Sequence, residues 1–190
     1  MSNADMQTLC NYARQFTGLT DEKVQILHQL YGDIQPHLNG VTDAFYARLS
    51  EIPKANAFLD GRTAQLKPIH VAWLNELFTS DFDAEYTQRI YKVGYVHVKV
   101  KLPVEFMSGA MSLILGELTP IILANYAGQT EMQAKALDAL NAAIAFSSLV
   151  MQESYQSSSL AEELERFLII TGMSRLLFDN LAKAYRKKAA

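Results

Sequence analysis

The residues best placed to do chemistry in this chain are its histidines, and His97 stands apart from the other three. Read as a helix, the stretch Tyr86–His97 carries apolar side chains at steps of four and three residues, so His97 ends an apolar stripe. The four histidines do not cluster at the spacing of a metal cage, so a structural zinc site is not expected. A histidine in this setting is either a core residue, the commoner case, or a single metal ligand.

Haem iron is the metal group that needs only one histidine from the protein, with the porphyrin buried among apolar side chains. Gly94 lies one turn before His97, where glycine costs about 1 kcal/mol relative to alanine, which indicates that something flat or bulky approaches the backbone. Leu102-Pro103 should end the helix. Residues Val96–Leu102 also alternate apolar and basic, as a strand would, but no second alternating run offers a partner, so a helix is favoured.

Composition narrows the class of protein. With 190 residues, 49% hydrophobic and 19% charged, the chain is large and apolar enough for one globular domain with a core, plus an extension. The net charge of −3 gives no electrostatic footprint for nucleic acid. The apolar run 110–127 is broken by Glu117 and Pro120, and the N-terminus has no secretory signal. We therefore expect a cytoplasmic protein that contacts neither nucleic acid nor membrane.

Common catalytic motifs are absent from the sequence. It has no glycine-rich phosphate loop, no Gly-x-Ser-x-Gly elbow and no His-Glu-x-x-His pair. A single cysteine, Cys10, excludes an internal disulfide and a cysteine-based metal cluster. Asp81 and Asp83 are better explained as loop and helix-cap residues than as a catalytic pair. The residues themselves give no reason to expect an enzyme.

Helical spacing dominates the first two thirds of the chain and predicts an all-α fold. Residues 1–19 are expected to form a short leading helix. Helix boundaries are then predicted from capping residues, prolines and glycines. The expected signals are a start at Thr20, a helix from Pro36 to Pro53, a connector holding Phe58 and Leu59, a helix after Asp60-Gly61, and the His97 helix capped by Asp83.

The last third should hold three helices. The first follows Pro103 and should bend at Pro120. Thr130 with Gln133 predicts a capping box that opens the second. The serine-rich run Ser154–Ser159 should interrupt it, and Ser159 with Glu162 should open a final helix that runs to the basic end of the chain.

Three segments resemble the bacterial globin-coupled sensors. The stretch Val93–Pro103 is similar to their proximal-histidine signature, Ile-Gly-x-x-His-x-x-x-x-Leu-x. Asp43-Ala44-Phe45-Tyr46 resembles the segment that carries the distal tyrosine of that family, and Gln65-Leu66 followed by Trp73 resembles its distal helix. The similarity spans roughly residues 20–150.

The resemblance implies a globin-like fold with an N-terminal extension and an extra C-terminal helix, divided into a sensor domain at 1–152 and an extension at 153–190. It implies haem b with His97 as the iron ligand, the other ring nitrogen of His97 donating to a carbonyl such as that of Val93. Tyr46 would donate a hydrogen bond to O₂, favouring it over carbon monoxide, and Leu66 and Ile69 would exclude water. The remaining implied pocket residues are Phe45, Phe58, Trp73, Val93, Val96, Val100, Leu102 and Phe106.

The implied function is reversible O₂ sensing, with CO and NO as further ligands, rather than catalysis. The output would reach a signalling partner through a homodimer of the helices beginning at Val104 and Thr130. Small residues there would permit close approach between subunits or pack inside one: Gly109, Gly116, Ala139, Ala142 and Ala145.

Two departures from the family pattern stand out: Phe106-Met107 replaces an aromatic pair, and Ile69 stands where some relatives have a hydroxyl. Two other functions stay open. One is a haem-free globin-like regulatory or dimerisation module, and the other is a haem enzyme that acts on O₂, NO or peroxide.

Overall fold

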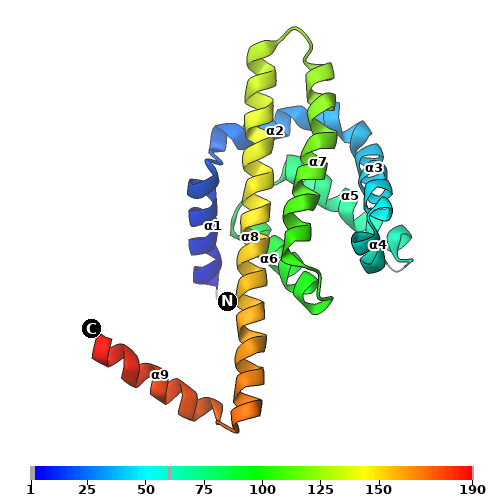
Figure 1. Ribbon diagram of the computed structural model, residues 1–190. Helices are drawn as coiled ribbons and strands as arrows, with labels where there is room; N and C mark the ends of the chain where they lie inside the picture. The colour runs from blue at the N-terminus through cyan, green and yellow to red at the C-terminus, as the bar shows by residue number, and fades with distance from the viewer. Residues whose placement is uncertain (1–2, 60, 190) are drawn as a thin grey trace.

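The computed structural model describes residues 3–59 and 61–189 (Figure 1), and throughout them the regular structure is helical. The all-α prediction is therefore confirmed for this part of the chain. The elements in chain order are α1 (Asn3–Thr17), α2 (Asp21–Ile34), the 3₁₀ turn η1 (Gln35–His37), α3 (Leu38–Glu51), α4 (Pro53–Leu59), α5 (Thr63–Thr79), α6 (Ala84–Lys99), α7 (Val104–Asn125), α8 (Thr130–Thr171) and α9 (Arg175–Ala189).

The long helix α8 is the centre of the fold. It packs against α1, α2, α6 and α7, while α5 packs on α2 and α3. The inward face of α8 is built from small and apolar residues, among them Ala139, Leu140, Ala143 and Phe146, all fully buried. Small side chains on one helix let its neighbours approach closely, and this is how α8 accommodates four other helices at once.

Local capping chemistry sets several helix starts as predicted. The Thr20 side chain accepts from the Lys23 N–H at 3.3 Å, and the Asp83 carboxylate accepts from the Tyr86 N–H at 2.8 Å. Each oxygen satisfies an amide that has no partner inside its own helix. Pro103 stands immediately before α7, where a missing amide hydrogen costs nothing.

Three predicted boundaries are wrong. Phe58 and Leu59 lie in the short helix α4 rather than in a connector. Thr130 makes no capping box, because the Gln133 side chain donates instead to the Leu123 carbonyl at 2.9 Å. The helix α8 also runs without a break through the serine-rich segment, and chain direction changes only at Gly172, whose φ of +66° favours glycine.

Tertiary contacts explain why the serines do not interrupt α8. Ser154 is fully buried, and the hydroxyl of Tyr155 donates to the Leu102 carbonyl at 2.7 Å. Serine is only a weak helix breaker, so packing against the end of α6 outweighs its local preference.

Among the described residues, α7 and α8 are long and apolar enough to cross a membrane by length and composition. The sequence did not predict this, because Glu117 and Pro120 interrupt the apolar run. In the fold, α8 is the central helix and α7 packs against it and against α3.

The small residues expected at a subunit interface fall into a buried and an exposed group, and the fifth, Ala145, is half-buried. Ala139 and Ala142 are buried within the subunit and serve its own packing. Gly109 and Gly116 are exposed, with no atom within 4 Å of an added Cβ. Only the two glycines therefore leave free space on the surface of the subunit.

Candidate functional site

Helix α6 carries His97 near its C-terminal end, on the face that also bears Val93, Val96 and Val100. The Nδ1 atom of His97 is buried and has no hydrogen-bond partner, so the predicted bond to the Val93 carbonyl is absent. Burial lowers the pKa of His97, because it disfavours the charged imidazolium. His97 is therefore held as a neutral imidazole, the state that can bind a metal.

The corner after α6 is fixed from two sides. Lys101 adopts a left-handed conformation with a φ of 56°, and the Leu102 N–H donates to the His97 carbonyl at 2.9 Å. The Leu102 carbonyl in turn accepts from Tyr155 of α8. The end of the His97 helix is thus tied to the central helix by a side chain that the sequence did not single out.

Gly94 explains how closely α6 approaches α8. A Cβ at this position would overlap the carbonyl oxygen of Met151 and lie 2.9 Å from the Cβ of Ser154. The bulky group expected at Gly94 is therefore the backbone of α8. At its other end α6 is anchored by Tyr86, whose buried hydroxyl lies 3.0 Å from the Ser147 hydroxyl.

Helices α3 and α5 bring a second set of aromatic groups together. Phe45 and Tyr46 of α3 are both buried, and their rings lie 4.7 and 5.7 Å from the His70 ring of α5. His70 also stacks on Trp73, with ring centroids 5.6 Å apart. Burial raises the pKa of Tyr46, so its hydroxyl keeps its proton and can donate a hydrogen bond at neutral pH.

His70 is the site residue that the sequence analysis missed. Both of its ring nitrogens are buried without a hydrogen-bond partner, and burial lowers its pKa to about 4. A signal for it existed, because Leu66, His70 and Trp73 follow one another at steps of four and three residues. His97 likewise follows apolar residues at steps of four and three along its own helix.

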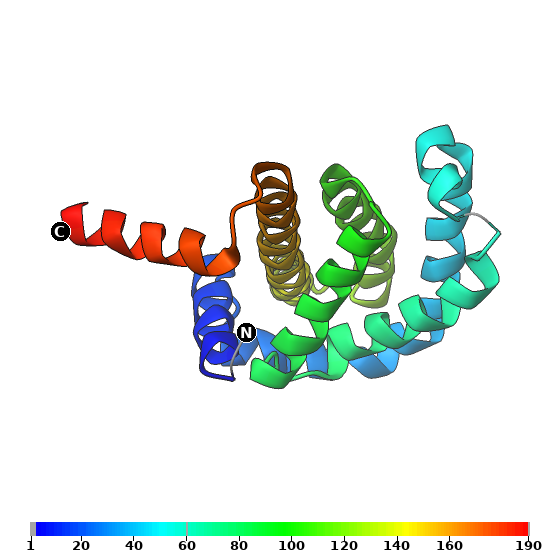
Figure 2. The ribbon, with the colours of Figure 1, turned by 90° about the horizontal axis from the view of Figure 1, so that it is seen from below.

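The buried polar atoms without partners gather on helices that carry these side chains. Besides the histidine nitrogens they include Oγ1 of Thr42 on α3, while a further one, Oγ of Ser154, lies on α8 against Gly94. Nε1 of Trp73 on α5 lies near the Tyr86 side chain. Nearly all buried polar groups in folded proteins have a partner, so such a group of unpaired atoms indicates a binding site for a further molecule. Figure 2 shows α5 and α6 diverging from the loop at residues 80–83 as the arms of a V, with α3 at the open end.

The other predicted pocket residues differ in how deeply they are buried. Phe58 and Phe106 contact each other edge to face at 5.6 Å, joining α4 to α7. Leu66, Trp73 and Leu102 are half-buried. Exposed apolar side chains are Ile69 at 68%, Val93 at 38%, Val96 at 48% and Val100 at 42%, on α5 and at the end of α6.

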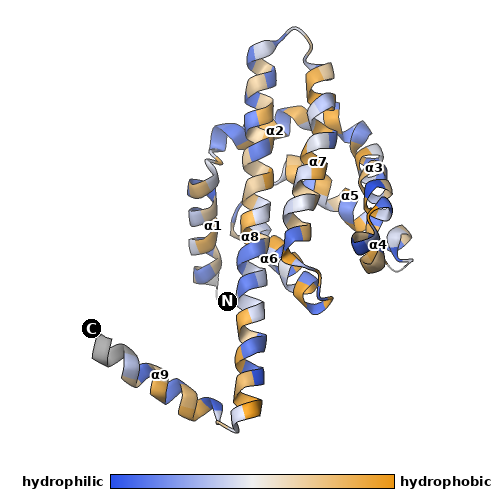
Figure 3. Cartoon of the chain, in the orientation of Figure 1, coloured by the Kyte–Doolittle hydropathy of each residue, from blue (hydrophilic) through white to orange (hydrophobic). Residues whose placement is uncertain are grey.

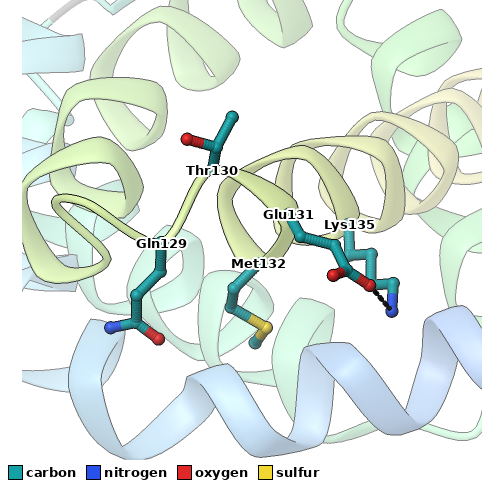
Figure 4. A pocket seen from close by; sticks show the side chains of 5 residues that line it. All are labelled: Gln129, Thr130, Glu131, Met132 and Lys135. Carbon is teal, nitrogen blue, oxygen red and sulfur yellow. Dashed lines mark ion pairs between the residues drawn. The ribbon is translucent and has the colours of Figure 1, made fainter.

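A separate pocket lies at the start of α8 and contains no histidine (Figure 4). It is lined by Gln129, Thr130, Glu131, Met132 and Lys135. Glu131 and Lys135 are paired with each other at 2.7 Å, one turn apart on an exposed helix face. This pocket offers no unpaired buried group, so the side chains of α3, α5 and α6 remain the candidate site for a cofactor.

Among the described residues, no group of three or more His, Cys, Asp or Glu side chains could hold a metal ion alone. The histidines of the site therefore fit a metal that brings most of its own ligands. Haem is such a group, since its iron takes four nitrogens from the porphyrin and needs one or two from the protein.

Solved structures of globin domains share this fold. The globin domain of the Geobacter sulfurreducens globin-coupled sensor superposes with a TM-score of 0.72 at 25% identity, covering 76% of this chain and 96% of that domain. The ferric form of the E. coli DosC globin domain has a TM-score of 0.66 at 19% identity, covering 77% and 99%. Its ferrous form has a TM-score of 0.60 at 20% identity, covering 75% and 98%.

The comparison with family models agrees with the fold. The model named Protoglobin matches residues 6–160, which include all the helices of the site from α3 to α6 and most of α8. The globin-like fold predicted from the three resembling segments is confirmed by these matches. The chain belongs to the Protoglobin family.

Proposed function

We propose that this protein binds haem b between α6 and the pair α3–α5, and that it senses O₂. The observation that carries the proposal is a pair of half-buried histidines, His97 and His70, on the two helices that form the V. Both have a lowered pKa, and their buried ring nitrogens (Nδ1 of His97, and Nδ1 and Nε2 of His70) have no hydrogen-bond partner. Exposed apolar residues on the same two helices would be covered by an apolar macrocycle. When bound, haem supplies a ferrous iron that takes up a diatomic gas reversibly.

On one side of the group, His97 would be the axial ligand. Its lowered pKa keeps the imidazole neutral, as metal ligation requires, and its buried Nδ1 has no protein partner. The bond from Tyr155 to Leu102 and the contact of Gly94 with Met151 hold the His97 helix against α8. Any displacement of His97 would therefore be transmitted to the central helix.

On the other side, Tyr46 and His70 supply the polar groups. Tyr46 would donate its hydroxyl proton to a ligand held on that face, which favours O₂ over CO because O₂ carries more negative charge. His70 would compete with the gas for the same face, since both of its nitrogens are free of protein partners. Leu66, Ile69, Phe45 and Trp73 would line this side.

The remaining lining would come from the neighbouring elements, namely Phe58, Val93, Val96, Val100, Leu102 and Phe106. Sensing would proceed through a helical homodimer to a signalling partner in the cytoplasm, without catalysis by this chain. NO and CO are expected as further ligands of the same site. The division at 152/153 would separate the sensor from its output extension.

Haem titration tests the proposal directly. Purified protein is titrated with hemin and then reduced, and the Soret band is recorded. His97→Ala should abolish the band or reduce affinity by at least a hundredfold, whereas His37→Ala, an exposed histidine on η1, should leave it unchanged. No Soret band in the wild-type protein would overturn the proposal and favour a haem-free regulatory module.

The choice of gas is tested by ligand kinetics on the reduced protein. Tyr46→Phe should speed O₂ release about tenfold, the loss of one hydrogen bond worth about 1.4 kcal/mol, and should leave CO release nearly unchanged. Equal effects on both gases would argue against Tyr46 as a donor. Rapid turnover of NO in the presence of a reductase would instead support a haem enzyme.

A further inference from the structure

The loop between α5 and α6, residues 80–83, joins the two arms of the V (Figure 2). Helix α5 carries His70 and helix α6 carries His97, so the conformation of this loop sets the angle between the two histidine-bearing helices. We call residues 80–83 the hinge loop. Any group of the protein that fixes the hinge loop also fixes the separation of the arms.

Phe82 gives the hinge loop an uncommon backbone conformation. Its φ of 52° lies in the left-handed region, which a bulky side chain rarely adopts. The ring is fully buried and contacts those of Tyr86 and Phe146, with centroids 4.7 and 5.5 Å away. Such a conformation persists only where the surrounding structure holds it in place.

Three successive backbone carbonyls of the hinge loop accept hydrogen bonds from side chains of other helices. The first, that of Ser80, accepts from Nε2 of His28 on α2 at 3.0 Å. The next two accept from α1, one from the Arg14 guanidinium and one from the Cys10 thiol, each at 3.3 Å. Loop carbonyls at a protein surface commonly bond to water, so three consecutive protein donors restrain this loop from outside the V.

Arg14 makes further contacts beyond the hinge loop. Its guanidinium donates to the Leu19 carbonyl at 3.3 Å and pairs with the Asp21 carboxylate. One side chain therefore joins α1, the start of α2 and the hinge loop. A guanidinium presents several donors in a rigid planar fork, and the single ammonium of a lysine does not reproduce this arrangement.

Helix α1 provides a fixed base for these contacts. Figure 3 shows apolar and polar residues recurring along it. The apolar side is buried, with Met6, Leu9, Cys10 and Ala13 at helical spacing, and α1 packs against α6 and α8. Cys10 and Arg14 therefore reach the hinge loop from a helix that is seated on the body of the protein.

We propose that α1 clamps the hinge loop, with Arg14 as the positioning residue, and that this clamp sets the separation of α5 and α6. The inference rests on the proposed function, because the separation matters for a group held between His70 and His97. While the hinge loop is held, the arms keep a fixed separation and retain a bound macrocycle. When the clamp is released, the arms move more freely and the macrocycle dissociates faster.

Hydrogen exchange on the full chain without haem tests the clamp. In Arg14→Ala the amides of residues 82–87 should exchange at least tenfold faster than in the wild type, whereas the amides of α8 should keep their rates. Arg14→Lys retains a positive charge beside Asp21 and should give a smaller increase at the same amides. This milder variant keeps the test decisive if Arg14→Ala does not fold.

Lys23→Ala is the matched control. The Lys23 side chain is 21% exposed, against 24% for Arg14, and it pairs with Asp138 of α8 at 2.9 Å rather than with the hinge loop. This variant should leave the exchange of residues 82–87 unchanged. Unchanged exchange in both Arg14 variants, or equal acceleration in Arg14→Ala and Lys23→Ala, would overturn the clamp.

Haem transfer to apomyoglobin tests the link between the clamp and the arms. After loading with hemin, Arg14→Ala should release haem at least threefold faster than the wild type, and Lys23→Ala should release it at the wild-type rate. Faster exchange of the hinge loop with unchanged haem release would overturn this link. Absence of a Soret band in the wild-type protein would contradict the proposed function instead, while the exchange measurement still decides the clamp.

Discussion

Gly94 of α6 lies directly against the backbone of Met151 in α8, with no space for a side chain between the two helices. His97 stands one turn further along α6, and α8 runs on from this contact to Thr171. The contact between Gly94 and Met151 is therefore the point at which a movement of His97 would be transmitted to α8.

Gly94→Ala should lower the free energy of unfolding by about 1–3 kcal/mol, because overpacking against a helix backbone outweighs the gain of about 1 kcal/mol in helix propensity. The measurement is urea unfolding followed by circular dichroism. Gly116→Ala is the matched control, since an added methyl group there meets nothing within 4 Å. Gly116→Ala should be neutral or stabilising, and equal loss in both variants would contradict the close contact.

The half-buried histidines His70 and His97 should make the haem-free protein sensitive to acid. The pKa of His70 is lowered to about 4 by burial, against about 6.5 in the unfolded chain. Between these values the unfolded chain binds a proton that the folded protein does not, so stability falls as the pH drops from about 6.5 to about 4. The loss from His70 alone is about 3 kcal/mol at about 1.4 kcal/mol per pH unit, and His97, whose pKa is also lowered, acts in the same direction.

Urea unfolding at pH 7.0 and pH 4.5 measures this dependence. His70→Leu removes the titrating group, so the difference in unfolding free energy between the two pH values should shrink. His37→Ala, which alters an exposed histidine, should keep the wild-type difference. If all three proteins lose the same stability on acidification, carboxylates on the surface account for the effect and His70 does not.

Local chemistry made much of the fold predictable. The Thr20 and Asp83 caps and the proline before α7 act on amides in their own helix, so the sequence alone locates them. The apolar stripe that ends at His97 is equally local. These local features place His97 near the end of its helix without reference to any tertiary contact.

The remaining features depend on neighbours that are distant in sequence. The serines of α8 stay helical because Ser154 and Tyr155 contact the end of α6, some 50 to 60 residues away. Gly94 could be recognised as a point of close approach, but only the fold shows that the approaching group is Met151. The family resemblance points to Ile69 rather than to its neighbour His70, and the aromatic partners of His70 come from α3, which is distant in sequence.

His70 should be visible in the spectrum of the reduced haem protein without added gas. If it competes for the face opposite His97, His70→Leu should convert the spectrum from a six-coordinate to a five-coordinate form and speed O₂ binding at least tenfold. The measurement is absorption spectroscopy combined with flash photolysis. His37→Ala is again the control, and an unchanged spectrum in His70→Leu would exclude His70 from the iron.

The hydrogen bond from the Tyr155 hydroxyl to the Leu102 carbonyl should restrain the turn that follows His97. Tyr155→Phe removes a hydrogen bond of 2.7 Å and leaves the Leu102 carbonyl without this donor, which should cost about 1 kcal/mol of stability. Because the same corner positions His97, haem transfer to an acceptor such as apomyoglobin should become several-fold faster. Tyr12→Phe, at a tyrosine that is 51% exposed on α1, should change neither quantity. Equal behaviour of the two variants would mean that α8 does not restrain the His97 helix through Tyr155, and that the contact at Gly94 carries the coupling alone.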